Sequence, residues 1–548
     1  MAKKDYNDYT REQLVDELIK LNKRKKYGLV WEEEKTKEKF EAEAEGKLPV
    51  LVEDKKREIK TDESKPTHIL IEGDNYHALS VLNYTHAKSI DVIYIDPPYN
   101  TGNNDFKYND KFVDHEDSYR HSKWLSFMSK RLKLAKNLLN NSGIIFISID
   151  DNEQGNLKLL CDEIFGEGNF HGTLTWVKRT KSTNSGKAKY MIQPRLEYIH
   201  CYGKINKADF NGFKLLNSDK EKKYPHKGLL GSCRFENLEA TDYGRKKRNT
   251  MKFPILGIKP REGKRWQVGE DEATELVNQK RIEIIEGIPK RAVYPEDEES
   301  YSFVPFWAHL DDTGSAEEGK KELSDIIGPE HNFDTVKPVN LIKRILERFN
   351  DKITILDFFA GSGTTGHAVL ELNKDEGNRQ FILCTNNENN ICTEICYPRV
   401  KKVIQGYESK KGKNILGLGS NLKYYKTNFV GSEQTHRNKK LLTDKSIEML
   451  CIKENTFDEV LNRKDIFIFK NKDKFTAILF DELKMDEFKN EIRKFKKPIS
   501  VYVFSLEGDD FKEDFLDLKN DITLCSIPEA ILKVYRRIFG IGQMKLKM

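Results

Sequence analysis

One short stretch of this chain combines a carboxylate, two prolines and an aromatic ring. Asp96-Pro97-Pro98-Tyr99 comes directly after Val92-Ile93-Tyr94-Ile95, whose β-branched and aromatic residues are typical of a buried strand. The exocyclic amino group of a base such as adenine is a poor nucleophile, because its lone pair is delocalised into the ring. If Asp96 and a free backbone carbonyl accept its two N–H bonds, the lone pair is localised and can attack an electrophilic methyl group.

The prolines and the tyrosine fit the same chemistry. Pro97 and Pro98 have no N–H and a fixed φ, so they hold the following residue rigidly. Tyr99 would offer a flat face on which an extruded base can stack, as chemistry on a base from inside a duplex requires. The simpler alternative is a strand that leads into a Pro-Pro turn with Asp96 as a helix cap.

A second segment, far downstream, has the pattern of a cofactor site. Residues 353–359 predict a buried strand, and the glycine-rich turn 361–366 follows at once, before an apolar helix. Such a turn lets a ligand approach the backbone closely, but it also satisfies G-x-G-x-x-G, so a nicotinamide dinucleotide site is the competing prediction. Asp357 precedes the turn, where it could meet the amino group of a methionine moiety and would repel a pyrophosphate. Glu388, after the next predicted strand, could bind ribose hydroxyls in either case.

Both segments must be brought together by the fold. Asp96 and Asp357 each end a predicted parallel strand, and open α/β sheets bind their ligands at the carboxyl ends of such strands. A target base and a cofactor would therefore meet at one edge of one sheet. An insert between the two halves could lie over this edge and contact DNA without disturbing the sheet.

Together these motifs resemble the β-group DNA amino-methyltransferases, in which an Asp-Pro-Pro-Tyr motif precedes a Phe-x-Gly-x-Gly motif. More closely, the chain resembles the modification subunit of type III restriction-modification systems. The resemblance spans roughly residues 66–548. It is carried by Ile71–Asn75, Asp96–Gly102, Phe106–Asp110, Ser148–Glu153, Thr313-Gly314, Phe333–Pro338, Asp357–Thr365 and Ile527–Tyr535.

This resemblance implies an α/β fold, a Rossmann-like open sheet of the S-adenosylmethionine-dependent methyltransferases with circularly permuted motif order. It also implies an inserted target-recognition domain and a small α/β C-terminal domain. The implied activity is site-specific methyl transfer from S-adenosylmethionine to the N6 amine of adenine in double-stranded DNA. The implied catalytic residues are Asp96, Pro97, Pro98 and Tyr99. The expected cofactor-binding residues are Asp74, Lys337, Pro338, Asp357, Phe359, Gly361, Gly363, Thr364 and Glu388.

Three other functions compete with this one. Methylation of the cytosine N4 amine uses the same chemistry, although Ser is more usual there in place of Asp96. A non-catalytic DNA-recognition subunit would need a degenerate site, and the motifs are intact. A dinucleotide oxidoreductase leaves the Asp96 loop unexplained. The resemblance also implies a homodimer, and because no G-x-x-x-x-G-K-[S/T] occurs, an ATPase and nuclease restriction subunit would have to be a separate partner.

The charge of the chain is concentrated in one segment. Residues 171–270 contain 23 Lys and Arg against 9 Asp and Glu, a net charge of +14 in a chain that carries +6 overall. Phosphate neutralisation and base contact would use such basic residues with aromatic ones between them. The alternative is a solvated basic face. The predicted DNA-binding residues are Lys178, Arg179, Arg245, Lys246, Lys247, Arg248 and Trp266.

The order of the segments predicts five parts, numbered along the chain. They are a charged arm or oligomer contact (1–65), the first half of the methyltransferase domain (66–170), the target-recognition insert (171–305), the second half (306–430) and the C-terminal α/β domain (431–548). Between a predicted strand and helix, Asp150, Asp151 and Glu153 are expected to cap the helix rather than to form an acid/base cluster.

Composition limits the class of protein. With 33% charged residues and no long apolar run, the chain predicts no membrane span and no signal peptide, and hence a cytoplasmic protein. The eight cysteines are scattered, which favours reduced thiols over a disulfide framework. Cys392 and Cys396 are the only close pair, and two further zinc ligands at suitable spacing are missing, so no metal site is expected.

Overall fold

The computed structural model describes residues 46–539 except 103–104, 109–110, 115, 211, 215, 243–247, 298–300, 332, 334, 434 and 506–510. Before residue 46 it describes only Thr10, Leu14, Trp31 and Glu38, so most of the predicted N-terminal arm lies outside the described residues. The chain divides into two compact units. Unit 1 is Met1–Gly212 with Trp307–Met548, and unit 2 is Phe213–Phe306.

Unit 1 is built on an 11-stranded sheet with the order β1-β23-β3-β20-β19-β4-β7-β9-β8-β18, in which β2 also pairs with β23. The strands are β1 (Lys47–Glu53), β2 (Ile59–Lys60), β3 (Thr67–Glu72), β4 (Ile90–Ile95), β7 (Leu139–Ile149), β8 (Phe170–Val177), β9 (Leu196–Gly203), β18 (His309–Leu310), β19 (Thr354–Asp357), β20 (Gln380–Thr385) and β23 (Asn421–Gly431). From β23 to β7 all neighbours are parallel. β9 is antiparallel to both β7 and β8.

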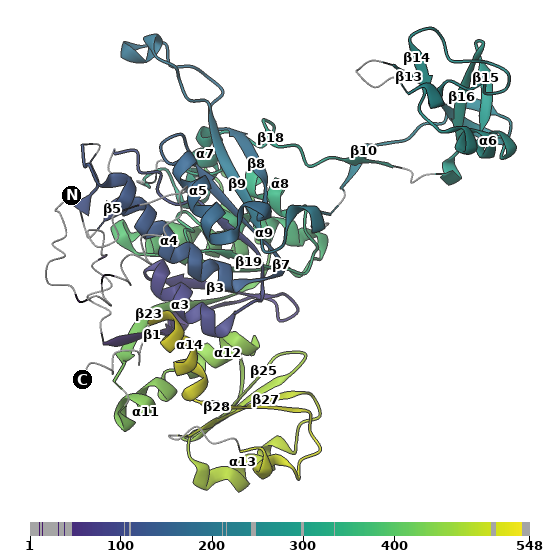
Figure 1. Ribbon diagram of the computed structural model, residues 1–548. Coiled ribbons are helices and arrows are strands. Elements are labelled where there is room, and N and C mark those ends of the chain that lie inside the picture. The colour runs from purple at the N-terminus through teal and green to yellow at the C-terminus, as the bar shows by residue number, and fades with distance from the viewer. Residues whose placement is uncertain are drawn as a thin grey trace. The chain divides into compact units, whose positions relative to one another are not determined.

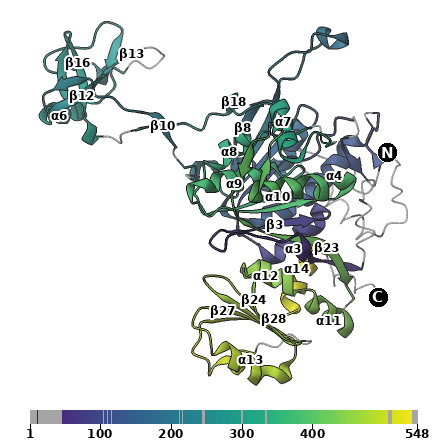
Figure 2. The same ribbon diagram turned by 180° about the vertical axis from the view of Figure 1, so that it is seen from behind.

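Helices cover both faces of this sheet, which explains why its central strands are continuously apolar. On one face α3 (Asn75–Thr85), α4 (Arg120–Leu138) and α5 (Gln154–Phe165) pack side by side (Figure 1). On the other lie α8 (Val339–Leu346), α9 (Thr364–Leu372) and α10 (Tyr397–Gln405), with α7 (Ala316–Ile327) against α10 (Figure 2). Strand residues between the two layers, such as Ile93, Leu356 and Ile382, are fully buried.

The pairing of β4 with β19 joins segments that are far apart in the sequence. Ile355 lies opposite Val92 and Leu356 opposite Ile93, with the two strands parallel. Asp96 and Asp357 therefore come to the same carboxyl edge, as the sequence predicted. The α/β class and the permuted order of the motifs are confirmed.

The first part of the predicted insert belongs to unit 1. The insert was expected from residue 171, but β8 and β9 extend the main sheet beyond β7. The physical reason is that Trp176 and Ile199 are buried in unit 1, so these strands complete its core. Most of the basic residues between 171 and 212 lie in the β8–β9 connection.

Unit 2 has its own sheet and core. Its strands β11 (His226–Gly228), β12 (Gly231–Asn237), β16 (Ile288–Val293) and β15 (Ile282–Ile285) form an antiparallel sheet in that order, and α6 (Glu270–Asn278) accompanies it (Figure 2). Two further pairs are β13 (Glu239–Thr241) with β14 (Lys264–Trp266) and β10 (Leu216–Glu221) with β17 (Tyr301–Val304). Its core contains Leu238, Ile255, Trp266, Val268, Ala273, Leu276 and Ile282.

The C-terminal part of unit 1 carries a separate five-stranded sheet. Its order is β24 (Asp458–Asn462), β25 (Ile466–Lys470), β26 (Phe475–Leu479), β27 (Ile499–Phe504) and β28 (Ile522–Ile527), with α13 (Met485–Ile492) packed on it. Helices α12 (Ile447–Glu454) and α14 (Glu529–Phe539) contact α3, while α11 (His436–Asp444) contacts β23. The Tyr535 hydroxyl donates to the Pro49 carbonyl of β1. This sheet is thereby fixed to the main one through buried contacts.

Three further observations concern the described residues. None of their helices has the length and hydrophobicity to cross a membrane. No cluster of three or more His, Cys, Asp or Glu side chains among them could hold a metal ion. The eight cysteines are all free thiols, and all but Cys525 are buried.

We expect the central strand β19 to limit the stability of the sheet. Leu356 is 0% exposed between β4 and β20, so Leu356→Ala should lower the free energy of unfolding by about 2–5 kcal/mol in urea denaturation. Leu416→Ala is the control, because that side chain is 82% exposed and should change the free energy by no more than about 0.5 kcal/mol. Equal losses in the two variants would contradict the packing described above.

Candidate active site

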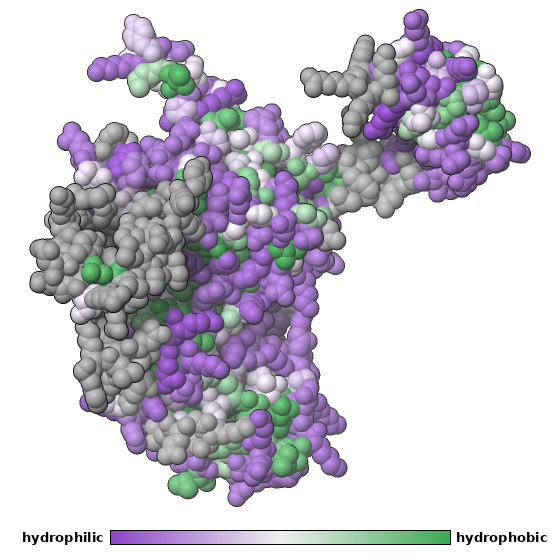
Figure 3. All heavy atoms as spheres, viewed as in Figure 1, coloured by the Kyte–Doolittle hydropathy of each residue, from purple (hydrophilic) through white to green (hydrophobic). Residues whose placement is uncertain are grey.

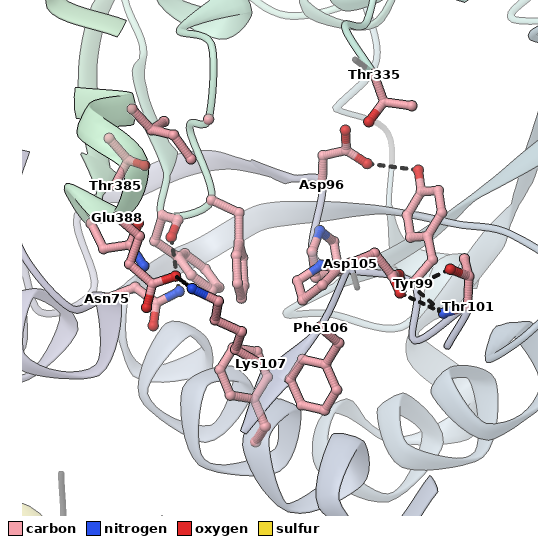
Figure 4. Close-up of a pocket in the computed structure, with 18 of the residues that line it drawn as sticks. Asn75, Asp96, Tyr99, Thr101, Asp105, Phe106, Lys107, Thr335, Thr385 and Glu388 are labelled. Atoms are coloured by element: carbon pink, nitrogen blue, oxygen red, sulfur yellow. Dashed lines mark hydrogen bonds and ion pairs between the residues drawn. The ribbon is translucent and has the colours of Figure 1, made fainter. Parts of the chain in front are cut away.

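A cavity of about 740 Å³ lies at the carboxyl ends of β3, β4, β19 and β20 in unit 1. Each strand end contributes to its wall: Asp74 and Asn75 after β3, Asp96 to Tyr99 after β4, Phe358 and Phe359 after β19, and Thr385, Asn386, Glu388 and Asn389 at the end of β20 and after it. Figure 4 shows Asp96, Tyr99 and Thr335 on one side, and Asn75, Lys107, Thr385 and Glu388 on the other. The cavity thus has a side next to the Asp-Pro-Pro-Tyr loop and a side next to the glycine turn.

The Asp96 carboxylate is held by two donors. The Tyr99 hydroxyl donates to Oδ1 at 2.7 Å, and the Lys337 ammonium donates to Oδ2 at 2.7 Å. Burial, together with the negative charges of Asp96 and Glu197, raises the pKa of Tyr99 well above its ordinary value. Tyr99 is therefore a neutral phenol that can donate its hydrogen.

Lys337 was predicted on the cofactor side, but its ammonium lies beside the Asp-Pro-Pro-Tyr loop. It is 2.7 Å from Asp96, 2.9 Å from the Tyr99 hydroxyl and 3.2 Å from Glu197. Burial disfavours its charge, but Asp96 and Glu197 outweigh burial and raise its pKa above the ordinary value. For Glu197, burial is outweighed by Lys337 and Lys178, and its pKa is lowered. The group is a buried network of alternating charges.

Backbone contacts fix the rest of the loop. The Trp124 indole N–H donates to the Pro98 carbonyl at 2.7 Å. Among the described residues no group donates to the Pro97 carbonyl, which leaves it as an acceptor beside Asp96. Asn100 has a positive φ of 58° and donates to Glu153 at 2.6 Å, so the loop is anchored immediately after Tyr99.

The capping prediction for the three carboxylates after β7 was wrong. No side chain caps α5. Glu153 is buried and accepts from Asn100 and Asn156, Asp150 accepts from Asn152, and Asp151 accepts from Tyr198. Glu153 instead supports the loop after β4, and the unusual φ of Asn100 is the conformation that this contact stabilises.

Aromatic rings form the walls on the cofactor side. Phe106, Phe127, Phe358 and Phe359 line the cavity, and the rings of Phe127 and Phe359 are 5.9 Å apart. Gly361, with a φ of 48°, completes this wall, and a Cβ there would lie 3.1 Å from Phe333. The glycine turn thus leaves room for a flat group against the backbone.

A buried arginine organises the end of the cavity near β3. Arg131 donates to both carboxylate oxygens of Glu38 at 3.1 Å and to Asn75 at 2.5 Å, and its Nη2 is 3.4 Å from Asp74. Asp74 caps α3 through its other oxygen, which accepts from the Tyr76 N–H. The predicted Asp74 therefore does line the cavity, with one carboxylate edge already occupied.

Acidic and amide side chains follow β20. Glu388 lines the cavity and its carboxylate is 3.2 Å from the Lys107 ammonium (Figure 4). Thr385 and Asn386 lie beside it in the wall. Lys107 comes from the short strand β5 (Lys107–Tyr108), so the loop after Tyr99 also contributes to the cofactor side.

Four predicted cofactor residues do not line the cavity. They are Pro338, Asp357, Gly363 and Thr364. Asp357 accepts from Thr365 at 2.6 Å and from the Phe359 N–H at 3.0 Å, and burial raises its pKa to about 7. A Cβ on Gly363 would meet Cys396 at 3.1 Å, away from the cavity. These residues shape the turn from behind, and sequence position alone could not separate the two faces of the turn.

Comparison with known proteins decides the family. The model of the DNA methylase family (N6_N4_Mtase) matches residues 90–396, more than half of the chain, and contains both motifs of the cavity. This chain belongs to the DNA methylase family.

Three relatives of this methylase are informative. The type III restriction-modification enzyme StyLTI Mod subunit of Salmonella typhimurium is 35% identical over 370 residues, which cover 62% of this chain and 56% of that protein. The EcoPI Mod subunit of Escherichia phage P1, also named type III, is 31% identical over 62% of this chain and 60% of its own. The type II methyltransferase M.KpnI of Klebsiella pneumoniae is 34% identical over 59% of this chain and 82% of its own. The methylase thus spans less than two thirds of the two Mod subunits.

Some residues of the site were not found from the sequence of this methylase. Arg131 stands on the apolar face of α4, and a cation among apolar residues of a helix could have indicated a buried ion pair. Glu197 is buried in β9 and pairs with Lys337 and Lys178, which the tertiary structure brings to it. Its sequence neighbours therefore gave no indication of its place in the site. Asn75 joins Arg131 to the Phe358 carbonyl, which likewise needs the tertiary structure.

The predicted DNA-contacting residues of the methylase fall into different classes. Lys178 lines the cavity and pairs with Glu197 at 3.1 Å, while Arg179 is exposed nearby in unit 1. In unit 2, Arg248 is exposed, and Arg245, Lys246 and Lys247 lie outside the described residues. The prediction for Trp266 was wrong, because its side chain is 0% exposed and donates to the Phe253 carbonyl in the core of unit 2.

Asp357 should give this methylase a pH-dependent stability. The unfolded carboxyl titrates near 3.8, so between about pH 4 and 7 the folded chain holds a proton that the unfolded chain has lost. This contribution favours the fold at low pH and is lost as the pH rises through 7. In cofactor-free urea denaturation, Asp357→Asn should gain stability relative to the unmodified chain by up to about 1.4 kcal/mol per pH unit across this range, then level off.

The exposed carboxyl of Asp351 supplies the matched control. Asp351→Asn is measured over the same range to remove effects common to any Asp→Asn change. A flat difference between Asp357→Asn and the unmodified chain would show that the Asp357 carboxyl is ionised throughout.

Proposed function

We propose that this methylase transfers a methyl group from S-adenosylmethionine to the N6 amine of adenine in double-stranded DNA. The observation that carries the proposal is the pairing of two acceptors, the Asp96 carboxylate and the open Pro97 carbonyl, in the same cavity as the glycine turn. The two N–H bonds of the flipped amine would be accepted by these groups. The nitrogen lone pair would then attack the methyl carbon as the carbon–sulfur bond breaks to leave a neutral thioether, and the amine would release one proton. Tyr99 would support the base as a stacking surface.

The residues on the other side of the cavity fit S-adenosylmethionine. When bound, this cofactor supplies an electrophilic methyl group on a sulfonium. Phe359 and Phe127 offer faces for its adenine ring, and Gly361 leaves space beside them. Glu388 would accept from the ribose hydroxyls, and Asp74, which also lines the cavity, would meet the methionine end. Asp357, bound to Thr365, would support this site through the turn.

Lys337 and Tyr99 would set the direction of the Asp96 carboxylate. Each occupies one carboxylate oxygen, so the amine must share an oxygen or displace a donor when it enters. Lys337 is itself held by Glu197, which gives it a second partner to move toward. The charge network can therefore open without leaving an ammonium unpaired.

An adenine target is favoured over cytosine by the acidic residue at the start of the motif. Cytosine N4 methylation uses the same acceptor geometry, with Ser more usual in place of Asp96. Sequencing DNA from cells that express this chain alone, with a readout that distinguishes N6-methyladenine from N4-methylcytosine, tests the choice. Finding only N4-methylcytosine would overturn the adenine proposal, and finding neither would favour a non-catalytic recognition subunit.

The partners follow from the relatives. Two of them are named type III Mod subunits, and this chain has no P-loop sequence, so we propose a modification and recognition subunit that acts with a separate ATPase and nuclease subunit in the cytoplasm. We also propose a homodimer. Unit 2, with Arg245–Arg248, is proposed as the domain that reads the target sequence. Such a domain, confined to residues 213–306, would leave the catalytic sheet complete.

Asp96 gives the sharpest test of the chemistry. Asp96→Ala should lower the rate of methyl transfer by at least about 10²-fold, because the amine loses its charged acceptor. Cofactor affinity, measured by calorimetry, should stay nearly unchanged. Asp150→Ala is the control, since Asp150 lines the same cavity but pairs with Asn152. Parallel loss of transfer and cofactor binding in Asp96→Ala would argue against the proposed role.

Two variants of Tyr99 separate the contribution of its ring from that of its hydroxyl. Tyr99→Phe keeps the ring and loses the hydroxyl, which donates to Asp96 and Glu197 and accepts from Lys337, so the transfer rate should fall by about tenfold or less. Tyr99→Ala also removes the stacking surface and should cost considerably more. If the two variants lose the same activity, the hydroxyl rather than the ring is essential.

A variant of Glu388 tests whether the cavity binds S-adenosylmethionine or a nicotinamide dinucleotide. Glu388→Gln should weaken S-adenosylmethionine binding by about tenfold or more, because a charged acceptor for ribose is removed, and leave DNA affinity unchanged. Glu394→Gln is the control, since Glu394 bonds Asn390 outside this cavity. Binding of NAD(H) but not S-adenosylmethionine to the unmodified chain would show that the site is a dinucleotide site.

A further inference from the structure

The connection between β8 and β9 forms a long arm on unit 1. We call Lys178–Leu196 the β8–β9 arm. It projects from the top of unit 1 in Figure 1 and carries the short helix η3 (Gly186–Tyr190) near its end. Figure 3 shows mainly hydrophilic residues along the arm and a hydrophobic group at its end.

The arm is positively charged along its whole length. It contains six basic residues and no Asp or Glu: Lys178, Arg179, Lys181, Lys187, Lys189 and Arg195. Apart from Lys178, all of these are exposed. A segment with this charge is suited to a partner that presents closely spaced negative charges.

The end of the arm exposes three consecutive apolar side chains. Tyr190 is 81% exposed, Met191 67% and Ile192 100%. Such side chains stay uncovered in water only at a cost, so their grouping indicates a surface that is covered when a partner binds.

Specific hydrogen bonds give the arm a defined shape. Gln193 accepts from the Thr183 N–H at 2.7 Å and donates to the carbonyls of Thr183 and Ala188. At the root, the Lys178 N–H donates to the Arg195 carbonyl at 3.0 Å. The two sides of the arm are thereby tied together, and the apolar end is presented beyond the Gln193 contacts.

The root of the arm belongs to the wall of the active-site cavity. Lys178 lines the cavity and pairs with Glu197, which follows the arm directly and is 3.2 Å from Lys337. The root of the arm is thus linked to Asp96 through Glu197 and Lys337. Of the arm residues, Lys178 lines the cavity.

We infer that the β8–β9 arm grips the DNA duplex next to the target base. Its cations contact the phosphates, and Tyr190, Met191 and Ile192 pack against the base faces exposed when the target base leaves the stack. This inference rests on the proposed methyl transfer to DNA. It assigns the arm a role in base extrusion, since apolar side chains that fill the vacated space stabilise the opened duplex.

The charge decides between DNA and a second copy of the chain as the occupant. The arm contains no carboxylate that could pair with its own cations. A protein surface that covered the apolar end would therefore also have to supply the negative charges that neutralise them. Duplex DNA supplies both the phosphates and the apolar base faces within a short distance. A second copy remains an outcome that the experiment can detect.

The first experiment removes the apolar end. The triple variant Tyr190→Ser, Met191→Ser, Ile192→Ser should methylate a fully paired duplex about tenfold or more slowly. It should be nearly normal on the same duplex with a mismatch at the target base, which is already unstacked. The control is Leu483→Ser with Leu516→Ser, which removes side chains 92% and 80% exposed elsewhere in unit 1.

The second experiment removes charge from the arm. Changing Arg179, Lys181, Lys187 and Lys189 to Gln should flatten the slope of log affinity against log salt by up to about 0.9 for each phosphate that is no longer neutralised. Changing the exposed Lys411 and Lys413 to Gln should leave the slope as it was.

The outcomes separate this inference from the proposed function. If the unmodified chain methylates no duplex, the proposed function fails, and the salt slopes still test the arm because binding requires no transfer. Unchanged rates in the triple variant on both duplexes, or an unchanged slope in the charge variant, would overturn the inference. A triple variant that loses self-association in sedimentation but methylates normally would assign the arm to a second copy, and would also overturn it.

Discussion

The parallel pairing of β4 with β19 is the constraint on which the site depends. Only a few residues of each strand are paired, yet this register brings the Asp96 loop and the glycine turn to the same sheet edge. Residues that follow the flanking strands, β7 and β20, complete the site. Glu153 follows β7 and anchors Asn100, and Glu388 follows β20 in the cavity wall. Burial of the central strands by two helix layers keeps this edge in register.

Electrostatics then connect the two halves of the cavity. Lys337 precedes α8 and is 241 residues from Asp96 in the sequence. Its ammonium completes a network with Asp96, Tyr99 and Glu197. A buried cation between two carboxylates restricts the arrangements in which all three groups are paired, so the network specifies the position of the Asp96 oxygens more than it adds stability. The same Lys337 accepts a hydrogen bond from Thr364 through its carbonyl, which links this network to the start of α9.

Sequence reasoning found what lies in contiguous motifs and missed what depends on side-chain direction. Asp96, Tyr99, Phe359, Gly361 and Glu388 line one cavity because each stands at a strand end or in the turn that follows. Asp357 and Gly363 were predicted to face the cofactor but lie behind the glycine turn, because neighbouring residues in a tight turn face opposite ways. Trp266 was predicted to contact DNA, but it packs in the core of the basic segment that contains it. Glu197 and Arg131 needed the tertiary structure. That Asp96 and Asp357 end parallel strands of one sheet followed from the strand patterns, whereas the assignment of β8 and β9 to unit 1 required their buried contacts.

The two ends of unit 2 are paired with each other. β10 enters the unit and β17 leaves it, and they run antiparallel with Leu216 opposite Val304. A segment whose entrance and exit are joined in this way is closed by its own backbone, and the strands of the main sheet are complete without it. Such a segment can be replaced as a whole by another with the same spacing between its ends. The architecture therefore permits the part between β10 and β17 to diverge rapidly, by recombination at two short flanks, while the chemistry at Asp96 stays unchanged.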